Sequence, residues 1–155
     1  MYNDAHDIYL DMQVNSATPQ KLRLMLLDGA IRFARQTQEL WGERDFDAAL
    51  EALIRCREIV GELLSGVHTD ESPLARQVGG LYVYLFSALV EVQQTRDAQQ
   101  LAAILGVLAS ERDTWRQVCE QLGDRPTAPA ASVLATREEL APMLLSSPAA
   151  FSIDA

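Results

Sequence analysis

Residues 18–42 read TPQKLRLMLLDGAIRFARQTQELWG, and this stretch predicts a long amphipathic helix. The hydroxyl of Thr18 can cap the helix, and Pro19 suits the first helical position because an N–H there would have no partner. Apolar residues then recur at helical spacing to about Trp41, where Gly42 can end the helix. The stretch favours an all-α fold.

The same pattern of a cap followed by periodic apolar residues recurs along the chain. Further capping candidates are Asp45, Ser72 (followed by a proline) and, for the last helix, Thr95 or Asp97. The periodic stretches run over about 19–41, 46–64 and 74–94, and a fourth ends near Leu122. Since each is about twenty residues long and the connections are short, the sequence predicts an antiparallel up-down four-helix bundle.

Two flanking segments differ in composition from the predicted bundle. The N-terminal segment, residues 1–17, holds Ile8, Tyr9 and Met12 at near-helical spacing. It is too short to form a stable helix alone. The second carries four prolines among alanines and serines, which is typical of a flexible tail, and a short helix is expected near 136–146. The expected organisation is an N-terminal capping segment (1–17), a bundle (18–123) and a tail (124–155).

Charge and composition exclude several classes of partner and chemistry. The 155 residues carry 22 acidic and 13 basic side chains, and this net charge of −9 disfavours nucleic acid and anionic membrane surfaces. Cys56 and Cys119 lack CxxC spacing, His6 and His68 complete no metal-binding pattern, and phosphate-cradling glycine loops are absent. No apolar run approaches the ~20 residues that cross a bilayer. We expect a cytoplasmic protein without metal, cofactor or membrane insertion.

Two of the predicted helices are apolar over more of their circumference than one core requires. A helix that faces a single core needs an apolar stripe a little over ~100° wide. In residues 19–41 two adjoining stripes cover about half the helix, interrupted by Arg23, and in residues 74–94 the side chains of Tyr82, Val83 and Phe86 widen the apolar side. Either neighbouring helices wrap these two more deeply, or an exposed groove receives an amphipathic helix of a partner.

Carboxylates fall on the outward stripes of the same helical wheels. A catalytic site would need convergent titratable groups inside the grooves. The sequence therefore predicts a binding protein and not an enzyme.

The order of several motifs resembles the FliS family of flagellin-specific export chaperones. The N-terminal part of the resemblance is Tyr9 followed by NSATPQKL (15–22) and LMLLDGAIRF (24–33). The later parts are LIRCREIVGEL (53–63), LYVYL (81–85) and RDTW (112–115), so the similarity covers residues 8–122.

The resemblance implies a cytosolic chaperone that binds the disordered C-terminal segment of flagellin in apolar grooves. Binding would prevent premature polymerisation and keep flagellin competent for flagellar type III export, and the loaded complex would dock on the export gate protein FlhA. The resemblance also implies that flagellin displaces the N-terminal segment, with Ile8, Tyr9 and Met12 as the removable cover. Together with the apolar excess, it predicts a groove lined by Leu24, Leu27, Ile31, Ile54, Tyr82, Val83 and Phe86.

A second class of function stays open at this point. A regulatory or scaffolding bundle could bind an amphipathic helix of another signalling or motility protein through the same kind of surface. Neighbouring genes for flagellin and flagellar export would favour the chaperone. We expect the free protein to be a monomer or a weak homodimer.

Overall fold

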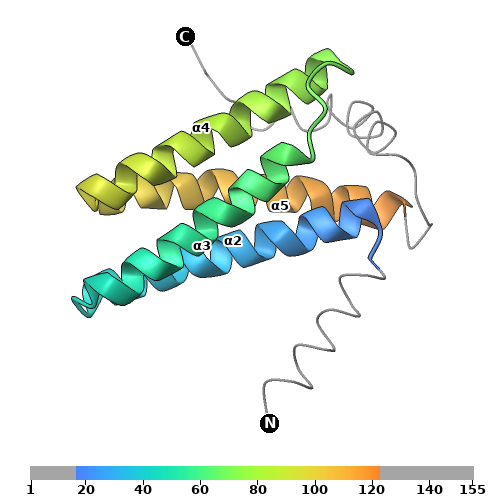
Figure 1. The fold of residues 1–155 in the computed structure, drawn as a ribbon. Coiled ribbons are helices and arrows are strands. Elements are labelled where there is room, and N and C mark those ends of the chain that lie inside the picture. The colour runs from blue at the N-terminus through green and yellow to red at the C-terminus, as the bar shows by residue number, and fades with distance from the viewer. Residues whose placement is uncertain (1–16, 123–155) are drawn as a thin grey trace.

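The computed structural model describes residues 17–122, whose regular structure is entirely helical (Figure 1). Its helices are α2 (Pro19–Gly42), α3 (Phe46–Ser65), α4 (Pro73–Thr95) and α5 (Ala98–Leu122). Successive helices run in opposite directions and are joined by short turns (Figure 1). The predicted all-α four-helix bundle is confirmed for this part of the chain. None of the helices in residues 17–122 has the length and apolar character that crossing a membrane requires.

Two of the predicted features lie outside the described residues. One is the N-terminal capping segment with Ile8, Tyr9 and Met12, and the other is the tail with its expected short helix near 136–146. Both stay predictions, as do the boundaries of the segments.

Side-chain caps begin all four helices, as the sequence predicts. A side-chain oxygen accepts a hydrogen bond from a backbone N–H in the first turn, which would otherwise have no partner within the helix. In the first three helices the pairs are Thr18 with Lys21 at 3.3 Å, Asp45 with Ala48 at 3.2 Å, and Ser72 with Ala75 at 3.0 Å. At α5 the cap is Asp97, whose Oδ1 accepts from the N–H groups of Gln99 and Gln100.

Two turns between helices place an arginine in the left-handed backbone conformation that glycine adopts most easily. Gly42 is the last residue of α2 and does not cap it; the left-handed backbone of this turn falls on Arg44, with φ of 62°. Arg96 takes the same conformation after α4, with φ of 52°. A left-handed residue with a Cβ costs roughly 1–2 kcal/mol, so both turns hold some backbone strain. The helix ends at Gly42 as predicted, but the capping residue is Glu43.

All four helices contribute to one apolar core. Helix α2 packs on α3 and α5, and α4 packs on the same two helices, with the α2–α3 contact the most extensive. Trp115 and Tyr82 are the largest fully buried side chains. Cys56 is completely buried, which raises the pKa of its thiol to about 12, whereas Cys119 is only partly buried.

Arg23, which interrupts the apolar side of α2, connects three helices. Its Nη2 donates to the carbonyl oxygen of Gly66 at 2.6 Å and its Nη1 to that of Leu63 at 3.4 Å. The guanidinium also lies 5.3 Å from the centroid of a Trp115 ring in α5. Since these carbonyls are at the C-terminal end of α3, where helical partners are missing, the cation caps that helix.

Replacing Arg23 by alanine should destabilise the bundle by about 2 kcal/mol, because charge-assisted hydrogen bonds and a partly buried cation–π contact are both lost. Urea unfolding of the full chain measures this loss. Arg35→Ala is the matched control, since Arg35 is an exposed arginine of the same helix. Equal stability of the two variants would show that Arg23 does not tie the helices together.

Candidate functional site

Large apolar side chains outside the core gather along the line where α3 and α4 meet. The most exposed of them are Phe46 and Leu50 at 39% each and Val83 at 51%; Tyr84, at 53%, lies on another side of α4. We call six residues the α3–α4 strip: Phe46, Leu50 and Ile54 of α3, spaced four apart, and Val83, Phe86 and Val90 of α4, spaced three and four apart. Such spacing places each set on one face of its helix. All six are exposed or partly exposed.

Two contacts hold the strip's helices against each other. A Cβ placed on Gly61 would lie 3.6 Å from Cε2 of Phe86, so the aromatic ring rests directly against the backbone of α3. Beside it, Nη1 of Arg57 donates to Oε1 of Gln93 at 2.8 Å. The guanidinium of Arg57 also lies 6.0 Å from the Phe86 ring centroid. The strip is therefore a continuous surface of two helices with a polar bridge across it.

Tyr84 is exposed on a different side of α4. It follows Val83 directly and so lies about 100° further round the helix. Glu91, seven residues after Tyr84, shares its face and accepts a hydrogen bond from Nε2 of Gln100 in α5. Tyr84 thus faces the α5 side of the bundle and does not belong to the strip.

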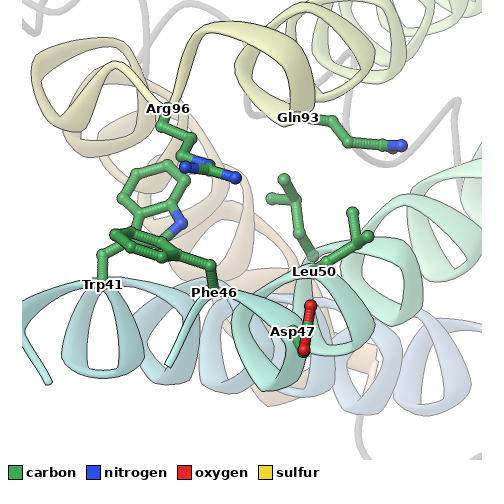
Figure 2. Close-up of a pocket in the computed structure, with 7 residues that line it drawn as sticks. Trp41, Phe46, Asp47, Leu50, Gln93 and Arg96 are labelled. Atoms are coloured by element: carbon green, nitrogen blue, oxygen red, sulfur yellow. The ribbon is translucent and has the colours of Figure 1, made fainter. Parts of the chain in front are cut away.

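A pocket opens at one end of the strip, beside the turn between α2 and α3 (Figure 2). Its empty volume is about 370 Å³, and its lining residues are Trp41, Phe46, Asp47, Leu50, Leu53, Gln93 and Arg96. Figure 2 shows the Arg96 side chain next to the Phe46 ring, with Trp41 also lining the pocket. Its guanidinium lies 4.3 Å from the Phe46 ring centroid, a distance typical of a cation–π contact. The pocket combines aromatic walls with one cation, Arg96, and one carboxylate, Asp47.

The seven residues predicted to line a groove fall into two groups. On the strip lie Ile54, Val83 and Phe86. In the core lie Leu27, Ile31 and Tyr82, which are at most 2% exposed, while Leu24 is partly buried and packs against that core. In this conformation a partner's side chain can reach the first group, whereas the buried three are enclosed by neighbouring helices. Direct contact with a partner stays a prediction for all seven.

Burial in the core accounts for the apolar excess of α2 but not for that of α4. Leu27 and Ile31 of α2 are buried, and the contacts of this helix with α3 and α5 are more extensive than those of α4 with the same two helices, so deeper wrapping accounts for its wide apolar side. In α4 the excess at Val83 stays half exposed. The apolar surface that stays exposed is therefore shared by α4, through Val83, and α3, through Phe46 and Leu50.

Glu111 departs from the expectation that carboxylates face outward. It is only 3% exposed and accepts a hydrogen bond from the hydroxyl of Tyr82 at 3.0 Å. The spacing could have shown this, since Glu111 follows Leu108 by three residues and precedes Trp115 by four, both of them fully buried. Within residues 17–122, no three acidic, histidine or cysteine side chains come together in a way that could hold a metal ion.

Removing the Tyr82 hydroxyl should destabilise the bundle by about 1.5 kcal/mol, because the buried carboxyl of Glu111 then loses a hydrogen-bond donor. Thermal or urea unfolding of Tyr82→Phe measures this. Tyr84→Phe removes the same atom from a half-exposed tyrosine on the same helix and should change stability by less than about 0.5 kcal/mol. Similar losses in the two variants would contradict a structural role for the buried pair.

Comparison with known proteins places this bundle in a family. The family model described as "Flagellar protein FliS" matches residues 1–122. The chain is 30% identical over 112 residues to the flagellar secretion chaperone FliS of Bacillus subtilis (strain 168), covering 72% of this chain and 84% of that protein. It is 26% identical over 113 residues to the flagellar secretion chaperone FliS of Salmonella typhimurium (strain LT2), with the same two coverages. The relatives are chaperones and not enzymes, which agrees with the sequence-based prediction, and the chain belongs to the FliS family of flagellar proteins.

Proposed function

We propose that this protein is a cytoplasmic secretion chaperone that binds the C-terminal segment of flagellin along the α3–α4 strip. Binding prevents premature polymerisation of flagellin and keeps it competent for flagellar type III export. The observation that supports this function is the half-exposed Val83 in a continuous apolar surface of two helices, in a chain that belongs to the FliS family.

The shape of the strip suits an amphipathic helix as the occupant. It follows the line between two packed helices, and an apolar helix face can lie along such a line with contacts every three or four residues. Contiguous apolar surface of this kind on a folded domain marks interaction sites. A client segment that is disordered before binding loses entropy when it becomes ordered, so a long interface is needed to reach useful affinity.

The predicted groove residues have two roles in this proposal. Ile54, Val83 and Phe86 contact the client directly. Leu27, Ile31 and Tyr82 belong to the core that supports the two helices from beneath, and their contribution to binding is through that support. Leu24 is partly buried against the core on α2 and is not part of the strip, so it is assigned to the same supporting role.

Two further steps follow from the resemblance to FliS. The N-terminal segment, through Ile8, Tyr9 and Met12, covers apolar surface in the free protein and is displaced by flagellin. The loaded chaperone then docks on the export gate protein FlhA. Both steps rest on the family resemblance and form part of the proposal.

Binding calorimetry with a flagellin C-terminal peptide tests the function and its location together. The full chain should bind at micromolar concentration or better, with a strongly negative heat-capacity change from burial of apolar surface. Val83→Asp should weaken binding at least about tenfold, because it places a charge in the contact. Tyr84→Asp, the neighbouring half-exposed residue on the other side of α4, should leave the affinity within about twofold.

Each result has a definite meaning for the proposal. An absence of binding by the unaltered protein at micromolar concentrations would reject the chaperone function. Equal weakening by Val83→Asp and Tyr84→Asp would instead reject the strip as the binding surface. Unfolding curves of both variants distinguish loss of binding from loss of fold.

A further inference from the structure

We propose that the α3–α4 strip selects a client helix with carboxylates along its margin, and that Arg57 and Arg96 recognise them. This inference rests on the proposed function, since it concerns how flagellin is recognised on the same strip. It adds a charge requirement to a surface that is otherwise apolar.

Arg57 lies in the middle of the strip. It is partly buried, and it bridges the two helices by donating to Gln93 at 2.8 Å while its guanidinium lies over the ring of Phe86. The amide oxygen of Gln93 is a neutral partner, and no carboxylate of the described residues lies within 4.0 Å of Arg57. The charge is therefore not neutralised locally.

Arg96 lies at the end of the strip, on the rim of the pocket. Its left-handed backbone, with φ of 52°, ends α4 and precedes α5, and its guanidinium lies over Phe46. Of the nearby acids, Glu91 accepts from Gln100 and Asp97 caps α5. Asp47 also lines the pocket, yet it makes no ion pair with Arg96.

Position on the apolar strip, over the rings of Phe86 and Phe46, distinguishes these two cations, because among the described residues only Arg112 and Arg116 make ion pairs at all. Arg112 lies 3.9 Å from Asp28 and 3.6 Å from Asp113, and Arg116 lies 3.8 Å from Asp113. Within residues 17–122, these ion pairs lie on the side of the bundle where α2 meets α5. The chain as a whole has a net charge of −9, whereas the apolar strip carries two arginines without an acidic partner.

A client that covers the strip must compensate these two charges. A helix packed over Phe86 and Phe46 removes water from the guanidinium groups that lie on those rings. Covering a charge without a partner is costly, and a carboxylate at the contact offsets that cost through charge-assisted hydrogen bonds. A client with lysine or arginine at the same places would be repelled, so the pair also provides specificity.

Affinity measured at two salt concentrations tests this inference. The flagellin C-terminal peptide is titrated into the full chain at 50 and 500 mM NaCl. At 50 mM NaCl the double variant Arg57→Gln/Arg96→Gln should bind the peptide about tenfold more weakly than the unaltered protein does. At 500 mM NaCl the two affinities should agree within about twofold, since salt screens partly exposed ion pairs. The matched control Arg116→Gln removes an exposed arginine of α5 and should change the affinity less than about twofold at both concentrations.

A second peptide shows which groups on the client are recognised. In it every Asp and Glu is replaced by Asn or Gln. It should bind the unaltered protein about tenfold more weakly at 50 mM NaCl and be insensitive to the double variant. Arg57→Lys/Arg96→Lys, which keeps both charges, should restore most of the affinity for the original peptide.

The outcomes separate this inference from the function on which it rests. If the original peptide binds and Val83→Asp weakens it, but the double variant matches Arg116→Gln at both salt concentrations, the recognition of carboxylates is rejected and the function stands. Sensitivity of the amide peptide to the double variant would also reject it. If the unaltered protein does not bind the peptide at all, the proposed function is rejected.

Discussion

A bundle of four helices has a single core, and α4 carries more apolar side chains than that core can cover. Leu85 and Leu89 are fully buried, while Val83, on the same helix, is half exposed. Val83 cannot turn inward without moving Leu85 and Leu89 outward, because successive positions around a helix are fixed at about 100°. The excess therefore stays at the surface, and the adjoining edge of α3 extends it to the strip.

The contacts between α3 and α4 determine the form of that surface. Gly61 lets the Phe86 ring approach the backbone of α3, and the Arg57–Gln93 hydrogen bond crosses between the helices beside it. Close to Gly61, at the C-terminal end of α3, Arg23 caps the last turn from α2 and lies over Trp115 of α5. One helix of the strip is thus tied to the core helices at its C-terminal end, which gives a client a preformed surface that needs little rearrangement.

Much of the fold was predictable from the sequence, because capping and periodicity are local properties. Thr18, Asp45 and Ser72 cap the helices they were expected to cap. The division of apolar residues between core and surface was not predictable, since it depends on how extensively neighbouring helices pack. Leu27 and Val83 both lie in helices that pack on α3 and α5, but the contacts of α2 are more extensive, and only Leu27 is buried.

The polar parts of the site show a similar division. Glu111 lies between buried positions of its own helix, so its burial could have been read from the spacing. No spacing in the sequence indicates where the Arg96 side chain lies. Its place over Phe46 depends on a left-handed turn and on the approach of α4 to the start of α3, and both are tertiary features.

Site-specific photo-cross-linking tests the central claim most directly, namely that the apolar excess of α4 is the surface that binds flagellin. A benzophenone side chain is introduced at Val83 in one variant and at Tyr84 in another, so that the two probes differ mainly in the side of the helix from which they project. We predict a cross-link from position 83 to the C-terminal segment of flagellin and little or none from position 84. Cross-linking from position 84 alone, or equally from both, would contradict the account.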